Sequence, residues 1–325
     1  TLRDRDDNVI RMKQQAIELE EIEVVSGDGT QLMKEALSLI TKNYETEPNM
    51  MVAFYREGIK KGSNHISLVE TVLDVYKESY RSFKEDQARI YIGRKATDIS
   101  PRDTVFMKFQ GGISGALLLD IAKHSDIVFG ESVNDYSYHI DGIVNIDNRP
   151  HYIIDFQPLP NIKEILFRGR VYLDVESLAF KRMEFNMNVE NRKEATSIFI
   201  KKKPSTMRVS AENAKYIVDF VEKNGKWYFN YSSTEVQFKV RWKRRFFGLF
   251  ASTYTISSEM AITDRYENDV QRFPRKERIR STDVIAEKVE YFQDPDFWGD
   301  YTVIEPDKEI TNAIKKLSDK LQRRD

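Results

Sequence analysis

Apolar and polar residues alternate with period two along most of the chain between residues 50 and 263. Such alternation is typical of β-strands that bury one face and leave the other in water. The clearest run covers 135–189, where Tyr136, Tyr138 and Ile140 alternate with Ser137 and His139. Similar runs predict further strands over 51–55, 66–76, 88–92, 216–221, 227–231, 236–242 and 254–262.

Turn sequences between these runs predict tight hairpins. Asp147-Asn148-Arg149-Pro150 and Asp174-Val175-Glu176-Ser177 each separate two apolar runs, and Asn224-Gly225 is the pair favoured where both turn residues need positive φ. Strands joined in this way form an antiparallel meander with one wet face and one buried face. We therefore predict a mainly β (α+β) fold, a strongly curved sheet or half-barrel that is continuous from Met51 to Thr263.

Three segments carry apolar residues at helical spacing instead. They are 31–43 with Thr30 as N-cap, 111–123 after two glycines, and 307–323 with Pro306 near its start. We expect these helices to cover the open side of the sheet. Residues 1–29 end in the turn-rich linker Ser26-Gly27-Asp28-Gly29, which suggests the end of an upstream domain, so the sheet domain is expected over 30–325.

Composition narrows the possible partners. The formal net charge is -1, with 51 basic and 52 acidic side chains, which argues against nucleic acid as the main partner. The chain has no cysteine, which removes disulfides, thiolate nucleophiles and cysteine-ligated metals. No apolar run approaches the 18 or so residues of a membrane span. The chain begins Thr-Leu-Arg-Asp, so any targeting segment is expected upstream.

Patterns that would indicate catalysis or metal binding are weak. The four histidines have no metal-ligand spacing, and His139 and His151 are better explained as polar-face residues than as a pair across a hairpin. The stretch 294–305 matches a calcium loop at four positions, but Trp298 stands where an oxygen ligand is needed. The glycines at 111, 112 and 115 fit no phosphate-binding pattern. We therefore expect no enzyme activity, no metal site and no cofactor.

The most unusual segment is 239–250, where five cations surround Trp242 and lead into a cluster of aromatic residues at an expected hairpin tip. This mixture suits the anionic face of a bilayer, with aromatics at headgroup depth and cations on phosphates. An ordinary hairpin, with aromatics packed on the core and solvated cations, is the alternative. The possible membrane or partner contacts are Trp242, Arg244, Arg245, Phe246, Phe247 and Phe250.

Several motifs resemble a known family. They are Ala53-Phe-Tyr-Arg-Glu57, the stretch from Phe109 to Lys123, Gly169-Arg-Val-Tyr-Leu-Asp174 and Phe297-Trp-Gly-Asp-Tyr-Thr-Val-Ile-Glu-Pro306. From Thr30 onward the chain resembles the region that follows the regulatory-like domain in carboxypeptidase-like regulatory domain-containing envelope proteins of Gram-negative bacteria. The hairpins over 135–189 are also similar to outer-membrane lipoprotein carriers, in which a half-barrel (LolA-like) encloses an apolar groove.

The resemblance implies a periplasmic or outer-membrane associated protein without peptidase activity. It implies that the concave face binds an apolar ligand, such as a lipid, or a lipidated partner such as a lipoprotein. The alternative is a protein–protein interaction module that docks an outer-membrane protein through the face or edge of its sheet. The possible groove residues are Tyr136, Tyr138, Ile140, Phe156, Phe167, Val171 and Phe185.

Overall fold

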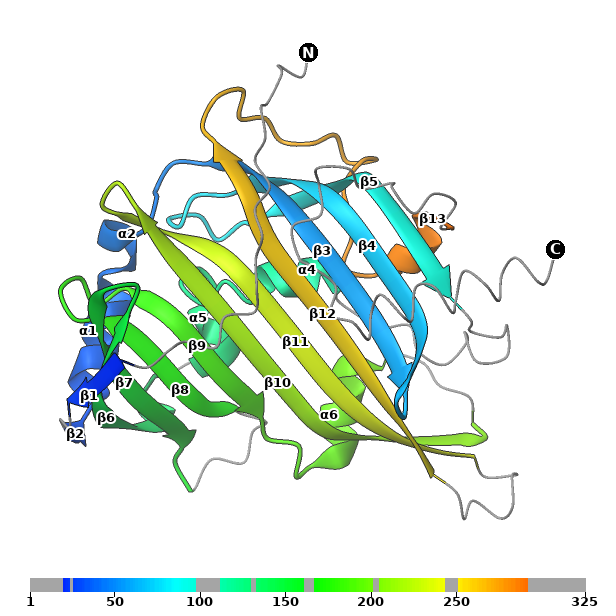
Figure 1. The fold of residues 1–325 in the computed structure, drawn as a ribbon, viewed down its shortest axis with the longest axis horizontal. Coiled ribbons are helices and arrows are strands. Elements are labelled where there is room, and N and C mark those ends of the chain that lie inside the picture. Colours follow the sequence, from blue (N-terminus) through cyan, green and yellow to red (C-terminus); the bar gives the residue numbers. More distant parts are fainter. Residues whose placement is uncertain are drawn as a thin grey trace.

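The computed structural model describes residues 20–23, 26–97, 112–129, 133–160, 167–200, 205–242 and 251–291. Within these ranges the strands form one 13-stranded sheet that does not close, in the order β1-β6-β7-β8-β9-β10-β11-β12-β3-β4-β5-β13, with β2 beside β6 (Figure 1). The strands are β1 (Glu20–Glu23), β2 (Gly27–Asp28), β3 (Asn49–Lys61), β4 (Asn64–Lys77), β5 (Gln87–Thr97), β6 (Tyr136–Ile146), β7 (Arg149–Pro158), β8 (Phe167–Asp174), β9 (Phe180–Met187), β10 (Met207–Lys223), β11 (Lys226–Trp242), β12 (Ala251–Tyr266) and β13 (Glu290–Tyr291).

Neighbouring strands are antiparallel except β13, which runs parallel to β5. The order departs from a simple meander where β1 pairs with β6, where β12 pairs with β3 and where β13 pairs with β5. The pairing of β12 with β3 puts Met260 opposite Tyr55. The first three long strands therefore extend the sheet beyond β12. The prediction of one mainly β, continuous antiparallel sheet is confirmed.

The hairpin turns follow from residues that tolerate positive φ. Asp147 and Asn148 (φ 50° and 60°) form a two-residue turn, so Arg149 and Pro150 belong to β7 and not to the turn as predicted. Asn224 and Gly225 (φ 54° and 76°) join β10 to β11 as the sequence predicts. These two-residue turns fix the register of the strands that they join, and the register decides which side chains face the interior.

Helices cover one face of the sheet, which we call the inner face (Figure 1). The helices are α1 (Thr30–Ser38), α2 (Ile40–Asn43), α4 (Gly112–Leu118), α5 (Ser125–Phe129) and α6 (Arg192–Phe199), with short 3-10 turns η1 (Val133–Asp135) and η3 (Ile285–Glu287). Residues of α1, α4, α5 and α6 share one apolar core with the inner-face strand residues. The sequence did not predict α5 and α6, whose short length leaves little periodicity to detect.

The predicted helix 31–43 is interrupted at Leu39, and its start differs from the prediction. Gly29 is the N-cap, and the Asp28 carboxylate accepts hydrogen bonds from the backbone N and the Oγ1 of Thr30 (2.9 and 2.6 Å). Thr30 is therefore the first residue of the helix and not its cap. Asp28 lies just before the N-cap, and its side chain provides an acceptor for the first N–H group of the helix.

The predicted helix 111–123 ends early, at Leu118. The chain then turns through Asp120, whose backbone O accepts hydrogen bonds from the N–H groups of Lys123 and His124 (3.0 and 2.8 Å). After this turn, Asp120 binds Lys77 and Lys123 binds Asp86, so both side chains belong to the same group of buried charges.

Residues 20–23 and 27–28 lie along the edge of the sheet, since both β1 and β2 pair with β6. This is part of the segment that we assigned to an upstream domain and linker, and the assignment of the residues before it stays a prediction. The predicted helix 307–323 lies outside the described residues.

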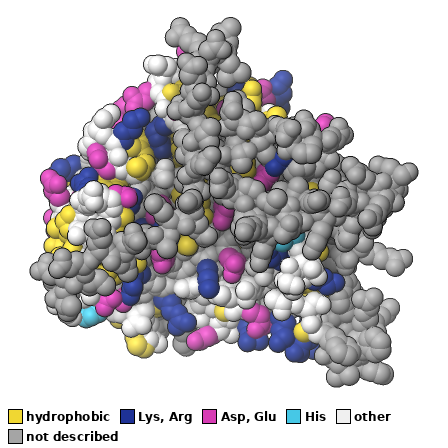
Figure 2. Space-filling view, in the orientation of Figure 1, with side chains coloured by type: hydrophobic (Ala, Val, Ile, Leu, Met, Phe, Trp, Pro, Cys, Tyr) yellow, Lys and Arg dark blue, Asp and Glu magenta, His cyan; other side chains and the backbone are white. Residues whose placement is uncertain are grey.

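The outer face of the central strands is polar. Arg182 on β9 binds Glu184 (2.6 Å) and Asp219 on β10 (2.9 Å), and Arg170 on β8 binds Asp155 (2.8 Å). Figure 2 shows cationic and anionic side chains interspersed over the coloured part of the visible face. Over β9 and β10 the outer face is therefore partly wet, as the alternation predicts, whereas β3 and β4 bury most residues of both faces and depart from that prediction.

Candidate functional site

The predicted groove residues lie on the inner face, where the structure packs them into the core. Six of the seven are at most 8% exposed, and Ile140 is partly buried against the same cluster. The six are Tyr136, Tyr138, Phe156, Phe167, Val171 and Phe185. The alternation thus identifies the correct face, and the chain's own side chains occupy the space in front of it.

Helix α5 supplies the ring that fills the β6–β7 end. Phe129 contacts Tyr136 edge-on and Phe156 edge-on, with ring centroids 5.7 and 5.6 Å apart. Further along the inner face, Phe185 stacks on Tyr216 of β10 at 5.0 Å, and Phe167 meets Phe185 edge-on at 5.4 Å. We call the rings of Phe129, Tyr136, Tyr138, Phe156, Phe167, Phe185 and Tyr216 the aromatic cluster.

The two hydroxyls at the start of β6 differ in their partners. Tyr136 donates to the backbone O of Val128 (2.5 Å) and accepts from the backbone N of Phe167 (3.4 Å). Burial raises the pKa of Tyr136 to about 12. The hydroxyl of Tyr138 is buried with no hydrogen-bond partner among the described residues, and burial raises its pKa further. An unpaired buried hydroxyl is uncommon and costs stability.

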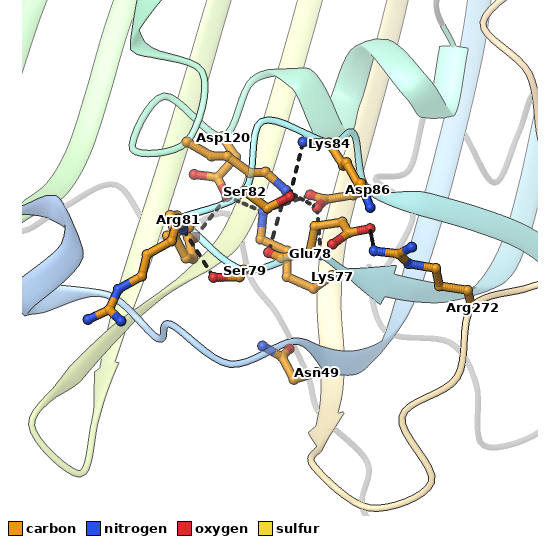
Figure 3. A network of polar contacts seen from close by, with 12 residues as sticks. Asn49, Lys77, Glu78, Ser79, Arg81, Ser82, Lys84, Asp86, Asp120 and Arg272 are labelled. Carbon is orange, nitrogen blue, oxygen red and sulfur yellow. Dashed lines mark hydrogen bonds and ion pairs between the residues drawn. The ribbon is translucent and has the colours of Figure 1, made fainter.

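A second buried region, at the end of β4, is charged. Lys77 Nζ lies 2.6 Å from Asp86 Oδ2 and 2.6 Å from Asp120 Oδ2, and Lys123 Nζ lies 2.6 Å from Asp86 Oδ1. All four side chains are at most 1% exposed. Two amines and two carboxylates therefore neutralise one another inside the protein, and Figure 3 labels Lys77, Asp86 and Asp120 of this group. We call these four residues the charged cluster.

Electrostatics hold the charged cluster in its ionised form. Burial by itself would lower the pKa of Lys77, but the carboxylates of Asp120 and Asp86 outweigh it and raise that pKa. Burial would raise the pKa of Asp86, and the amines of Lys77 and Lys123 outweigh it and lower that pKa. Burial lowers the pKa of Lys123 and of the neighbouring His124. The shifts at Lys77 and Asp86 therefore favour an ionised pair, whereas the lowered pKa of Lys123 opposes its charge.

The charged cluster is joined to the aromatic interior by a chain of tyrosines. Tyr80 donates its hydroxyl hydrogen to Asp120 Oδ2 (2.8 Å), and its ring lies 5.0 Å from that of Tyr44. Tyr44 in turn meets Phe220 of β10 edge-on at 5.5 Å and accepts from the backbone N of Phe180 (2.9 Å). The cluster is thus an integral part of the fold.

Sequence reasoning missed the charged cluster, although one signal was present. Val69, Leu73 and Val75 face the core, and Lys77 continues the same period-2 series. A lysine at an inward position requires a buried counter-charge. The pattern could have identified Lys77, but neither Asp86 nor Asp120 is marked by its local sequence.

The histidine pair across the β6–β7 hairpin does not form. The register places His139 opposite Asp155 and His151 opposite Val144. His151 is buried, its Nδ1 lies 2.7 Å from the backbone O of Arg149, and its Nε2 lies 3.9 Å from Asp174. His139 is exposed, whereas His151 is buried although it lies on the same side of β7 as Asp155, the side opposite to Ile154 and Phe156.

Other predicted sites lie outside the described residues. Those are Arg244, Arg245, Phe246, Phe247, Phe250 and the calcium-like stretch 294–305. Trp242 ends β11 opposite Met207. In the part of the chain that the structure describes, no group of three or more His, Asp and Glu side chains is arranged to hold a metal ion. No described helix is both long enough and apolar enough to cross a membrane.

These observations define a class of protein: an open antiparallel β-sheet whose helices fill its inner face. No protein-family model matches the chain, and no curated protein matches it. Among solved structures it is similar to a DUF1329 family protein from Desulfovibrio piger, with 14% identity, 76% of this chain and 96% of that chain covered, and a TM-score of 0.29. A TM-score this low supports no inference about function.

Proposed function

We propose that this chain is a non-catalytic protein of the Gram-negative cell envelope, periplasmic or associated with the outer membrane, that acts as a protein–protein interaction module. The observation that supports the proposal is the packed inner face, where six of the seven candidate groove residues are at most 8% exposed. A filled face offers no free apolar surface to a ligand. Binding then falls to the outer face, the sheet edges and the loops.

The charged cluster supports the non-catalytic part of the proposal. An amine nucleophile needs a lowered pKa and access to substrate, whereas Lys77 has a raised pKa and a side chain that is 1% exposed. Lys123 is equally buried and is held by Asp86 at 2.6 Å. These side chains are arranged to neutralise one another, which is a structural role.

A second candidate function is carriage of an apolar ligand or lipidated partner on the inner face. One observation favours it: the Tyr138 hydroxyl is buried in the aromatic cluster and has no partner among the described residues. The polar end of an amphipathic ligand would satisfy this hydroxyl if α5 moved aside. The cost is the loss of the Phe129 ring contacts.

Site-specific photo-crosslinking in envelopes tests the proposed function. A photoreactive residue replaces Tyr91 on β5, Val221 on β10 or Ile198 on α6, which are exposed apolar side chains far apart in the sequence. We expect one of the three positions to crosslink to a single protein. Addition of that protein in purified form should reduce the amount of crosslinked product. Uniform crosslinking at all three, or none at any of them, contradicts an interaction module.

Binding of an apolar dye separates the two candidates. The proposed function predicts no saturable binding of 1-N-phenylnaphthylamine by the native chain, because the aromatic cluster is full. The second candidate predicts saturable binding that is kept or strengthened when Tyr138 is replaced by Phe, because the apolar dye then meets a ring edge in place of an unpaired hydroxyl.

A further inference from the structure

The loop between β4 and β5, residues 78–86, has a fixed base. The Asp86 carboxylate accepts from the backbone N of Glu78 (2.9 Å) and binds both amines of the charged cluster. Ser79 Oγ donates to the backbone O of Thr46 (2.5 Å) and accepts from the backbone N of Arg81 (3.1 Å). Figure 3 shows this loop closed over Lys77 and Asp86. The buried ion pairs thus hold both ends of an exposed loop.

The tip of this loop carries an apolar side chain that the fold does not use. Phe83 is 104% exposed, the largest exposure among the large apolar residues that the structure describes. Arg81 and Lys84 beside it are also exposed and form no ion pair with described residues. Single exposed apolar residues are ordinary on protein surfaces, so Phe83 indicates a binding role only in combination with the cations beside it.

A neighbouring segment adds positive charge at the same end of the sheet. Residues 272–279 lie against the start of β5: the backbone N of Phe273 donates to Gln87 (3.2 Å), and that of Ile279 donates to Ala88 (2.8 Å). Arg272 of the same segment binds Glu78 at the base of the loop (2.7 Å). Arg275 and Lys276 between these contacts are exposed and unpaired within the described residues.

We infer that Phe83, with Arg81, Lys84, Arg275 and Lys276, forms a docking surface for an anionic lipid bilayer. The ring would enter the headgroup region and the four cations would approach lipid phosphates. Among the described residues of these two segments, four exposed cations form no ion pair, against one such exposed acid, Glu85. This inference goes beyond the proposed function, because the docking surface would hold the chain at a membrane while a protein partner binds another surface of the chain.

The isolation of the ring favours lipid over a protein partner. Aromatic hot spots in protein interfaces are surrounded by further contact residues that exclude water. Phe83 instead stands between Ser82 and Lys84, and its full exposure leaves no surrounding contact surface. Shallow insertion into a bilayer needs only the ring and nearby cations.

This surface is separate from the predicted contact around Phe246. Loop 78–86 lies where β3 and β4 pair Asn49 with Lys77, next to the Tyr266 end of β12. The segment 243–250 lies outside the described residues, so the two surfaces are distinguished by variants.

The test uses vesicles of phosphatidylglycerol and phosphatidylcholine in equal parts, with pure phosphatidylcholine as the comparison. The chain has no cysteine, so Phe83→Cys gives a single labelling site for the environment-sensitive dye NBD, and Val221→Cys on β10 gives the control site. Sedimentation is measured at low and high salt for the wild type, for Phe83→Ser and for Arg81→Gln with Lys84→Gln. The charge-matched control is Lys215→Gln with Lys239→Gln, both exposed on the sheet.

We expect the wild type to sediment with the anionic vesicles at low salt and to be released as salt rises. Loss of two cations should lower partitioning about 25-fold, at about fivefold for each, and Phe83→Ser should lower it about tenfold or more. The Lys215 and Lys239 control should bind as the wild type does. NBD at position 83, and not at position 221, should shift to the blue.

Three results overturn the inference: no sedimentation of the wild type, equal binding by Phe83→Ser and the wild type, or no dye shift at position 83. A blue shift at position 83 on addition of a soluble acidic protein, without vesicle binding, assigns the loop to a protein partner and also overturns it. The photo-crosslinking positions lie outside this loop, so failure here leaves the test of the proposed function intact.

Discussion

The interior of this protein contains two regions with opposite chemistry, the aromatic cluster over β6–β10 and the charged cluster at the end of β4. In the aromatic cluster, ring centroids lie 5.0 to 6.3 Å apart, and all members but Phe129 of α5 come from the inner face of the strands. The charged cluster draws four ions together at 2.6 Å from β4, the loop after it and the turn after α4.

The two regions should differ in how strongly the removal of one side chain destabilises the protein. Apolar contacts are numerous and individually weak, so a neighbouring ring can fill part of a gap. A buried ion has few partners, and removal of one leaves an uncompensated charge away from water. A single substitution should therefore destabilise the protein moderately in the aromatic cluster and strongly in the charged cluster.

The largest expected effect is at Asp86, which binds both lysines of the charged cluster. Asp86→Asn leaves Lys77 and Lys123 with one carboxylate between them, and we expect a loss of about 3–5 kcal/mol in the free energy of unfolding. Urea denaturation followed by circular dichroism measures it. The control is Asp74→Asn, whose partner Arg89 is 40% exposed, and which should cost about 0–1 kcal/mol. Equal effects from the two variants would remove the contrast between the regions.

The next effect is in the aromatic cluster. Phe185→Ala removes a ring that stacks on Tyr216 and meets Phe167 edge-on. We expect a loss of about 3 kcal/mol, at the lower end of the range for buried phenylalanine, because both neighbours can lean into the space. The same denaturation experiment measures it. A loss below about 1 kcal/mol would mean that this face is loosely packed, which favours a ligand-binding interior.

Much of the fold can be predicted from the sequence, because strand alternation and turn residues are local signals. Asn224-Gly225 and the Tyr136–Ile140 alternation each identify their element and its buried face. Pairing of β12 with β3 has no such signal, since it joins residues about two hundred positions apart. The early end of α4 depends on Asp120 reaching Lys77, a contact set by tertiary structure.

The candidate site, like the fold, could be predicted only in part from the sequence. The seven groove residues were placed on the correct face because period two decides the face, but the sequence cannot say whether another element fills the space in front. Phe129 fills it from α5, a five-residue helix too short for periodicity to predict. Phe83 was missed because an isolated phenylalanine in a polar loop resembles any other until its exposure is known.

A smaller effect concerns pH, and it separates the two regions directly. The pKa of Asp86 is lower in the folded protein than in the unfolded chain, where it is about 3.9. Its stabilisation is therefore present above about pH 4 and is lost as pH falls through the folded-state pKa. The difference in unfolding free energy between wild type and Asp86→Asn should shrink below pH 4, while the difference for Phe185→Ala stays constant. A constant difference for both would show that Asp86 is not held as an ion.

The smallest expected effect is at Tyr138. Tyr138→Phe removes a buried hydroxyl that has no partner among the described residues. We expect a change between zero and a gain of about 1 kcal/mol in the free energy of unfolding, because no hydrogen bond is lost and a desolvated polar group is removed. The matched control is Tyr136→Phe, which loses the bond to Val128 and should be destabilised. A clear loss of stability at Tyr138 would mean that its hydroxyl has a bound partner in solution.

The measurement that tests the central claim most directly is native mass spectrometry of the chain purified from envelopes without harsh detergent. The packed inner face, with Phe129 seated on Tyr136 and Phe156, predicts the mass of the polypeptide alone. Lipid bound only at the surface would dissociate at low collision energy. A lipid adduct that survives high collision energy, and disappears when Phe156 is replaced by Trp to crowd the inner face, would contradict the account.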